Sequence, residues 1–110
     1  MLDLLKNLLK KDYQNLDGKA FRSLYEQEKA NAVLIDVRTS DEFRAGTLPG
    51  AINMDIMNAG FRQWAGELDA TKEYFVFCRS GARSASACSI MASKGLRAVN
   101  LMGGLSAWPR

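Results

Sequence analysis

The chain has 110 residues, of which 47% are hydrophobic and 25% are charged. These proportions are typical of a folded globular protein and disfavour both a disordered chain and a membrane-embedded one. The length fits one domain that can bury a core without disulfide bonds. The net charge is +3, but lysines and arginines are scattered along the chain, so the sequence does not indicate nucleic-acid binding. Small anions are more natural partners than nucleic acids for a chain with this charge.

Residues 1–12 predict a short N-terminal amphipathic helix, and residues 13–110 a single domain. The helix is predicted from leucines that fall on one side of it: Leu2, Leu4, Leu5, Leu8 and Leu9. Asp3 and Lys6 interrupt the apolar run and no small-residue cleavage site follows, so we expect neither a secretory signal nor a membrane span. The leucine stripe either packs on the domain itself or docks on a partner or a membrane.

The first half of the domain predicts strands alternating with helices. Tyr13 to Leu16 favours a short strand, and Asp17 is a suitable N-cap for a helix that runs toward Lys29. Residues 32–37 form a continuous apolar run, which is typical of a strand buried on both faces of a parallel sheet. Residues 51–56 predict a third strand.

The second half continues the alternation. Residues 58–68 favour a helix with Trp64 in the core, residues 74–77 a strand, residues 84–94 a helix and residues 96–101 a last strand. The fold class is therefore α/β, with a mainly parallel sheet of about five strands and helices on both faces. Ligands bind such sheets beyond the carboxyl ends of the strands, where Cys78, Asp36 and Arg38 emerge. Asp36 and Arg38 form either a structural ion pair or part of the mouth of a site.

Cys78 is the candidate nucleophile, because it lies where an apolar strand gives way to a helix. In that position the amides of the following loop can turn toward the sulfur, and the positive end of the helix dipole favours a thiolate. Arg79 and Arg83 add positive charge nearby, and cysteines in such surroundings have a lowered pKa. The alternative is a buried structural cysteine, which gives no reason for two arginines and a glycine in the loop.

Catalytic groups that need an imidazole are excluded by composition. The chain contains no histidine, so Cys78 cannot use a Cys-His pair, and we expect no metal and no organic cofactor. Cys88 aligns with alanines on the predicted helix and is interpreted as a buried small side chain without chemistry. A chain that uses one free thiol is suited to a reducing compartment, which favours the cytoplasm.

Three ordered motifs resemble those of the rhodanese family. Cys78 and Arg83 are separated by four residues, one fewer than in the loop of protein tyrosine phosphatases, and the shorter loop better suits a sulfur-centred species than a phosphate. Residues 34–38 with 41–43, and then 46–53, are similar to the first rhodanese signature, although Thr47 stands where the family usually has histidine. Residues 102–108 resemble its closing motif, in which Gly103 and Gly104 would let the backbone approach the site and Trp108 packs.

The resemblance implies sulfur transfer through a persulfide on Cys78. The loop that would hold this persulfide comprises Arg79, Ser80, Gly81, Ala82, Arg83 and Ser84. We expect Arg83 to orient the loop, Arg79 to attract the donor, and Arg38 to pair with Asp41 or Glu42.

The implied donor is a small anion such as thiosulfate, or a protein persulfide, and the implied acceptor is a thiol or cyanide. A non-catalytic rhodanese-like module for protein interaction or sulfur carriage remains the alternative. An arsenate reductase or phosphatase is disfavoured by the short loop.

Overall fold

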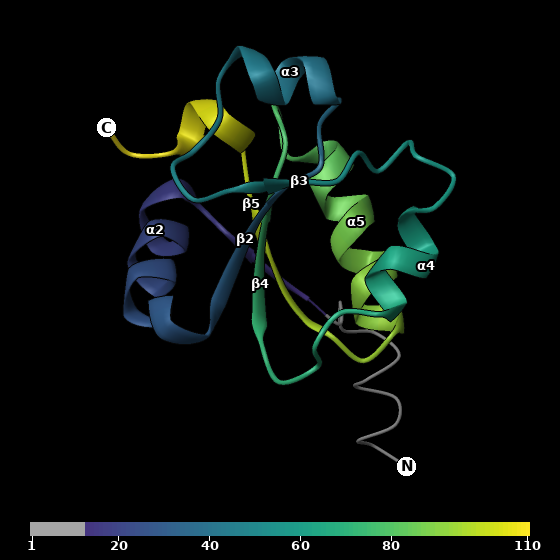
Figure 1. Ribbon diagram of the computed structural model, residues 1–110. Helices are drawn as coiled ribbons and strands as arrows, with labels where there is room; N and C mark the ends of the chain where they lie inside the picture. Colours follow the sequence, from purple (N-terminus) through teal and green to yellow (C-terminus); the bar gives the residue numbers. More distant parts are fainter. Residues whose placement is uncertain (1–12) are drawn as a thin grey trace.

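The protein is described here by a computed structural model over residues 13–110 (Figure 1). Its sheet has the strand order β1-β5-β4-β2-β3, and every neighbouring pair is parallel. The strands are β1 (Gln14–Leu16), β2 (Ala32–Asp36), β3 (Ile52–Asn53), β4 (Glu73–Phe77) and β5 (Arg97–Leu101). The predicted α/β class with five parallel strands is confirmed.

Helices cover both faces of this sheet. Helix α2 (Gly18–Gln27) and the short 3-10 helix η2 (Gly104–Ala107) lie on one face, and α4 (Phe61–Gly66) and α5 (Ala82–Ser93) lie on the other (Figure 1). The other helices within residues 13–110 are η1 (Lys29–Asn31), which precedes β2, and α3 (Ser40–Ala45), which follows β2. Because α3 follows a strand, it sits at the carboxyl edge of the sheet, beside the start of α5.

Alternate residues of β4 divide the core into two layers. Tyr74, Val76 and the following Cys78 face α4 and α5, whereas Phe75 and Phe77 face α2. On the α2 side, Phe21 meets Phe75 edge-on with ring centroids 5.4 Å apart. The strand is therefore buried on both faces, as its unbroken apolar sequence predicts. This register directs the side chain of Cys78 toward α5.

Several predicted boundaries differ from the structure. The strand predicted over 51–56 is shortened to β3, because the chain leaves the sheet beyond Asn53. The amides of Met54 and Ile56 still donate hydrogen bonds to the carbonyls of Asp36 and Val37. The helix predicted over 58–68 begins only at Phe61, since a turn precedes it. Helix α5 begins before its predicted start, and α3 was not predicted at all.

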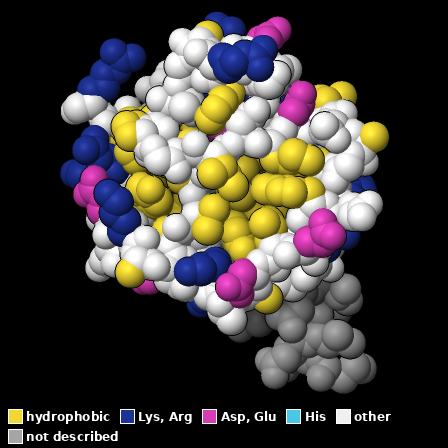
Figure 2. Space-filling view, in the orientation of Figure 1, with side chains coloured by type: hydrophobic (Ala, Val, Ile, Leu, Met, Phe, Trp, Pro, Cys, Tyr) yellow, Lys and Arg dark blue, Asp and Glu magenta, His cyan; other side chains and the backbone are white. Residues whose placement is uncertain are grey.

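The N-terminal amphipathic helix predicted over 1–12 lies outside the described residues. Within residues 13–110, none of the helices is long and apolar enough to cross a membrane. No further strand of residues 13–110 pairs with the β3 edge, and Figure 2 shows hydrophobic side chains gathered in the middle of the corresponding face. Ile52 of β3 is 45% exposed.

Candidate active site

Cys78 lies directly after β4 and four residues before α5, fully buried on the α5 side of the sheet. Its Sγ accepts hydrogen bonds from the Gly81 amide at 3.1 Å, the Ser84 amide at 3.4 Å and the Ser84 hydroxyl at 3.3 Å. The loop thus turns its N–H groups toward the sulfur, as expected from the strand–loop–helix sequence. A negative charge on the sulfur would be stabilised by all three donors.

The surroundings of Cys78 favour the thiolate. Burial acts to raise the pKa of the thiol, but hydrogen bonds from the hydroxyl and amide of Ser84 and from the amides of Gly81 and Ser80 outweigh it. The pKa of Cys78 is therefore lowered below its ordinary value. Hydrogen bonding within the loop is what lowers the pKa of the thiol, and Ser84 contributes two of the donors.

Two glycines allow the loop to take this shape. Gly81 has φ +97°, a left-handed conformation that disfavours other residues, and a Cβ there would lie 3.1 Å from both the Leu101 carbonyl and the Gly103 amide. A Cβ on Gly104 would overlap the carbonyl group of Arg79. The amide of Leu105 also donates to the carbonyl of Cys78 at 3.0 Å. The segment after β5 therefore supports the loop closely, which confirms the role expected for Gly104.

Arg83 is held by Glu42, a partner that the sequence does not indicate. Its guanidinium donates to both carboxylate oxygens of Glu42, at 2.8 and 3.1 Å. This hydrogen bonding is the main cause that lowers the pKa of Glu42 to about 2, and it raises the pKa of Arg83. Glu42 also closes a capping box with Thr39 at the start of α3. The Thr-x-x-Glu pattern is a sequence signal that could have located this helix.

Arg38 forms a different ion pair from the one expected. It was expected to bind Asp41 or Glu42, but its guanidinium binds the fully buried Asp36, with Nη2 2.7 Å from Oδ2. Asp36 and Arg38 therefore form a buried ion pair, and Arg38 also lines the pocket described below, so the two alternatives for these residues do not exclude each other. Thr47 donates its hydroxyl to the same Asp36 oxygen at 2.9 Å. A hydroxyl thus binds Asp36 from the position where the rhodanese family usually has histidine.

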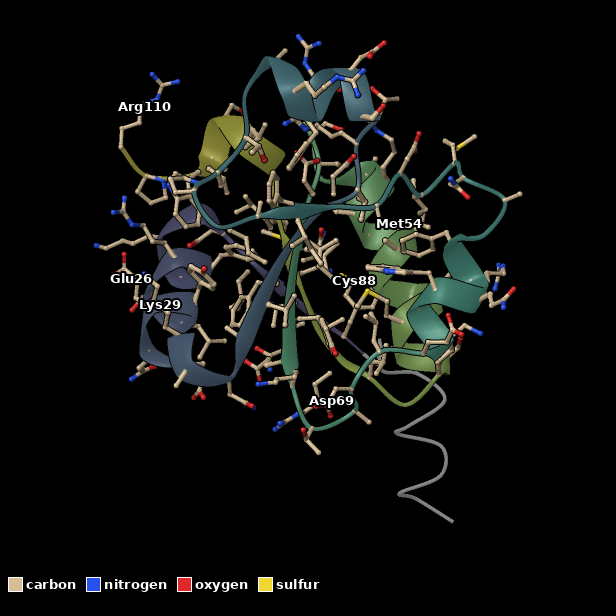
Figure 3. All side chains as sticks on the ribbon, viewed as in Figure 1. Glu26, Lys29, Met54, Asp69, Cys88 and Arg110 are labelled. Atoms are coloured by element: carbon tan, nitrogen blue, oxygen red, sulfur yellow. The ribbon has the colours of Figure 1, made fainter. Side chains whose placement is uncertain are left out.

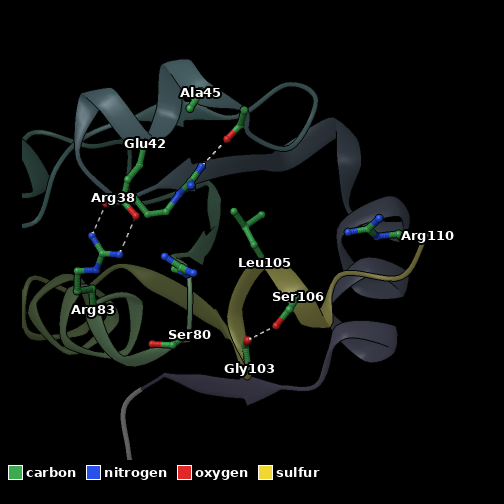
Figure 4. Close-up of a pocket in the computed structure, with 11 residues that line it drawn as sticks. Arg38, Glu42, Ala45, Ser80, Arg83, Gly103, Leu105, Ser106 and Arg110 are labelled. Carbon is green, nitrogen blue, oxygen red and sulfur yellow. Dashed lines mark hydrogen bonds and ion pairs between the residues drawn. The ribbon is translucent and has the colours of Figure 1, made fainter.

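A pocket of about 810 Å³ opens over the loop (Figure 4). Arg38, Arg79, Arg83 and Arg110 contribute positive charge to its lining, and Glu42 contributes negative charge. Arg38 and Arg83 are engaged with carboxylates, whereas the Arg79 side chain makes no hydrogen bond or ion pair within residues 13–110. Ser80 lines the pocket as well, but Cys78 does not. The structure brings the predicted loop residues, Asp36 and Arg38 to one edge of the sheet.

Cys88 is fully buried between α5 and the sheet (Figure 3). Burial raises the pKa of its thiol far above the ordinary value, and the nearby charge of Cys78 acts in the same direction. A thiol that stays protonated and has no access to solvent is chemically inert. The interpretation of Cys88 as a core side chain agrees with this environment.

Comparisons with known proteins assign the family. The family model described as "Rhodanese-like domain" matches residues 19–110. YtwF of Bacillus subtilis is 39% identical over 75 residues, covering 68% of this chain and 71% of that protein. A protein of Allochromatium vinosum named "Sulfurtransferase" is 35% identical over 81 residues, covering 73% of this chain and 74% of its own length.

A solved structure shows the same fold. The crystal structure of a rhodanese-related protein from Thermoplasma volcanium matches with a TM-score of 0.72 and 27% identity, covering 87% of this chain and 90% of that one. The family match agrees with the motifs around Cys78 and with the all-parallel sheet. The chain belongs to the family of rhodanese-like domains.

Proposed function

We propose that the protein is a sulfurtransferase that moves a sulfane sulfur from a donor such as thiosulfate to a thiophilic acceptor, through a persulfide on Cys78. The observation that carries this proposal is the set of three hydrogen-bond donors directed at the Cys78 sulfur. Membership of the rhodanese-like family and the name of the Allochromatium relative support a sulfur-transfer role.

The proposed reaction has two displacements. In the first, the Cys78 thiolate attacks the outer sulfur of thiosulfate, an S–S bond forms to Cys78, and the original S–S bond breaks as sulfite leaves with the electron pair. In the second, a thiolate or cyanide attacks the terminal persulfide sulfur and releases the Cys78 thiolate. The inward amides of the loop would stabilise the anionic sulfur in both steps. No external oxidant or reductant is required.

The arginines of the pocket have separate roles in this proposal. Arg79 lines the pocket without a carboxylate partner in residues 13–110, which leaves its charge available to attract an anionic donor. Arg83 is fixed by Glu42 and lies in the first turn of α5, so it would orient the loop rather than bind the donor. The Asp36–Arg38 pair would support the loop after β2.

A non-catalytic module for protein interaction or sulfur carriage is the second candidate. It is favoured by the burial of Cys78, whose side chain has no exposed surface and does not line the pocket. A donor can reach the sulfur only if the residues that cover it move. If a specific partner protein provides that movement, small donors alone would leave Cys78 unmodified.

Incubation with thiosulfate followed by intact mass measurement, together with an assay of thiosulfate turnover with cyanide, separates these candidates. Sulfur transfer predicts a mass gain of one sulfur atom that fragmentation localises to Cys78, and its loss when cyanide is added. Cys78→Ser should abolish the gain and the turnover of thiosulfate with cyanide. Cys88→Ser is the matched control and should keep most of both, because Cys88 is fully buried. Equal loss in the two variants, or an unmodified wild-type chain, would contradict the proposal.

The proposed reaction also indicates which donors and acceptors and which cellular compartment suit the protein. The pocket offers charge complementarity to a small anionic donor, and the acceptor in this proposal is any thiol or cyanide that reaches the persulfide. A protein persulfide is an equally suitable donor, because it presents the same outer sulfur. A free thiol that must stay reduced between turnovers suits the cytoplasm.

A further inference from the structure

Asn100 is a polar residue in the interior of a strand that is otherwise almost entirely buried and apolar. It lies in β5, is 2% exposed, and pairs in register with Asn15 of β1 and with Val76 of β4. Neighbouring Ala98 belongs to the core layer on the α5 side, and alternation along the strand puts Asn100 on that same side. Cys78 faces this layer from the adjacent strand, two residues beyond Val76. Asn100 is therefore next to the active-site loop.

The side-chain amide of Asn100 makes two hydrogen bonds and leaves one atom unsatisfied. Its Nδ2 donates to Oδ1 of Asn15 at 2.9 Å and to the carbonyl of Gly81 at 3.3 Å. Its own Oδ1 is the one buried side-chain nitrogen or oxygen atom in the described part of the chain that has no partner. A buried polar atom without a partner destabilises the folded state, because it loses its hydrogen bonds to water. An apolar residue of similar size would avoid this cost, so stability alone does not explain the amide.

Gly81 is the residue on which the geometry of the loop depends. Its N–H donates to Sγ of Cys78 at 3.1 Å, and its carbonyl accepts from Asn100 and, at 3.1 Å, from the amide of Ala85. The N–H and the carbonyl of Gly81 belong to two successive peptide groups, each of which is planar. The relative orientation of these two groups is set only by φ and ψ of Gly81. Glycine itself restricts these two torsions very little. Contacts to the carbonyl must therefore supply the restriction.

We propose that Asn100 is a positioning residue of the active-site loop, whose amide fixes the Gly81 carbonyl and so keeps the Gly81 N–H directed at the Cys78 sulfur. The inference rests on the proposed sulfur transfer only for the biological role of this contact. The hydrogen bond from Asn100 to Gly81 affects the Cys78 sulfur whether or not a donor is present. It explains why a buried amide with an unsatisfied oxygen is found in β5.

Two substitutions separate positioning from mere support of the sheet. Asn100→Leu removes the donor to Gly81 and the bond to Asn15, while Asn15→Leu removes only the bond between the strands. If Asn100 acts through Gly81, Asn100→Leu should raise the pKa of Cys78 and lower its alkylation rate near neutral pH by about 3- to 10-fold. Asn15→Leu should leave both unchanged. The modified residue is identified by mass spectrometry.

A second measurement reports on the hydrogen bond from the Gly81 amide to the Cys78 sulfur. The amide proton of Gly81 in a nitrogen-15-labelled sample should change its chemical shift in Asn100→Leu and keep it in Asn15→Leu. If Asn100→Leu does not fold, Asn100→Ala carries the same test, because it removes the donor without adding volume. Equal effects of the substitutions at Asn100 and Asn15, or an unchanged thiol in the variant at Asn100, would overturn the inference.

Failure of this inference and failure of the proposed function give different results. If wild-type Cys78 takes up sulfur from thiosulfate and Asn100→Leu has an unchanged pKa, the positioning role is wrong and the function stands. If wild-type Cys78 takes up no sulfur while Asn100→Leu alone raises the pKa, the positioning role stands and the function is wrong.

Discussion

Glu42 and Arg83 join α3 to the first turn of α5 through a bidentate ion pair, with distances of 2.8 and 3.1 Å. Glu42 is also the third residue of α3, where its carboxylate accepts from the amide of Thr39 and its own amide donates to the Thr39 hydroxyl. One carboxylate thus fixes the start of α3 and the loop of Cys78 at once. The pair has physical consequences that can be measured.

Glu42→Gln should remove a pH-dependent part of the free energy of unfolding. The pKa of Glu42 is lowered from 4.5 to about 2, so its contribution is complete above pH 4.5 and is lost as the pH falls through about 2. Urea unfolding of the wild type should therefore show a loss of stability over this range that is smaller in the variant. Asp41→Asn is the matched control, because Asp41 is an exposed neighbour that pairs with Arg44. An identical pH dependence in wild type and Glu42→Gln would contradict the expectation.

Ser84→Ala should raise the pKa of Cys78, because it removes the hydroxyl that donates to the sulfur at 3.3 Å while keeping the amide. We expect alkylation of Cys78 near neutral pH to slow by about 3- to 10-fold, and the acid limb of the pH–rate profile for sulfur transfer to move to higher pH. Ser86→Ala, an exposed position on the same helix, should change neither. An unshifted profile in Ser84→Ala would show that the hydroxyl does not stabilise the thiolate.

Arg79→Ala should mainly raise the KM for thiosulfate, because Arg79 lines the pocket and has no ion-pair partner in the region from residue 13 onward. Arg83→Ala should mainly lower kcat, since it breaks the contact with Glu42 that holds the loop. Steady-state kinetics over a range of thiosulfate concentrations distinguish the two effects. Arg62→Ala removes an exposed charge of α4 and serves as the control for net charge. The opposite assignment of KM and kcat effects would show that the two roles are exchanged.

Loop length should select the chemistry. The unmodified protein should hydrolyse aryl phosphates at no measurable rate while turning over thiosulfate. Insertion of one glycine after Gly81 moves the donors of Ser84 away from the sulfur, and a displacement of about 1 Å can lower a rate by about 100-fold. We expect this variant to lose sulfur transfer.

The matched control for the insertion is a glycine placed after Gly95. This exposed turn joins α5 to β5, and a Cβ at Gly95 would have no neighbour within 4 Å, so the insertion should leave transfer nearly unchanged. Efficient phosphatase activity in the wild type, or full transfer in the Gly81 insertion variant, would show that loop length does not decide the reaction.

The amino-acid sequence by itself determined the fold class and the place of Cys78. Unbroken apolar runs such as residues 32–37 predict strands buried on both faces, and such strands require a parallel sheet covered by helices on two sides. Cys78 follows one of these runs and precedes helix-forming sequence, so its position at a carboxyl edge follows from local pattern alone. The absence of histidine excludes a Cys-His pair, so the sequence predicts that any activation of the thiol comes from the loop itself.

Only the tertiary structure decided which side chains meet. Glu42 and Arg83 are 41 residues apart, and Asn100 and Gly81 are 19 apart. Whether such residues come within hydrogen-bond distance depends on the order and register of the strands that carry them. The order β1-β5-β4-β2-β3 puts β5 beside β4 and so brings Asn100 to the loop of Cys78. Local propensities contain no information on strand order, because it is fixed by how the whole chain packs.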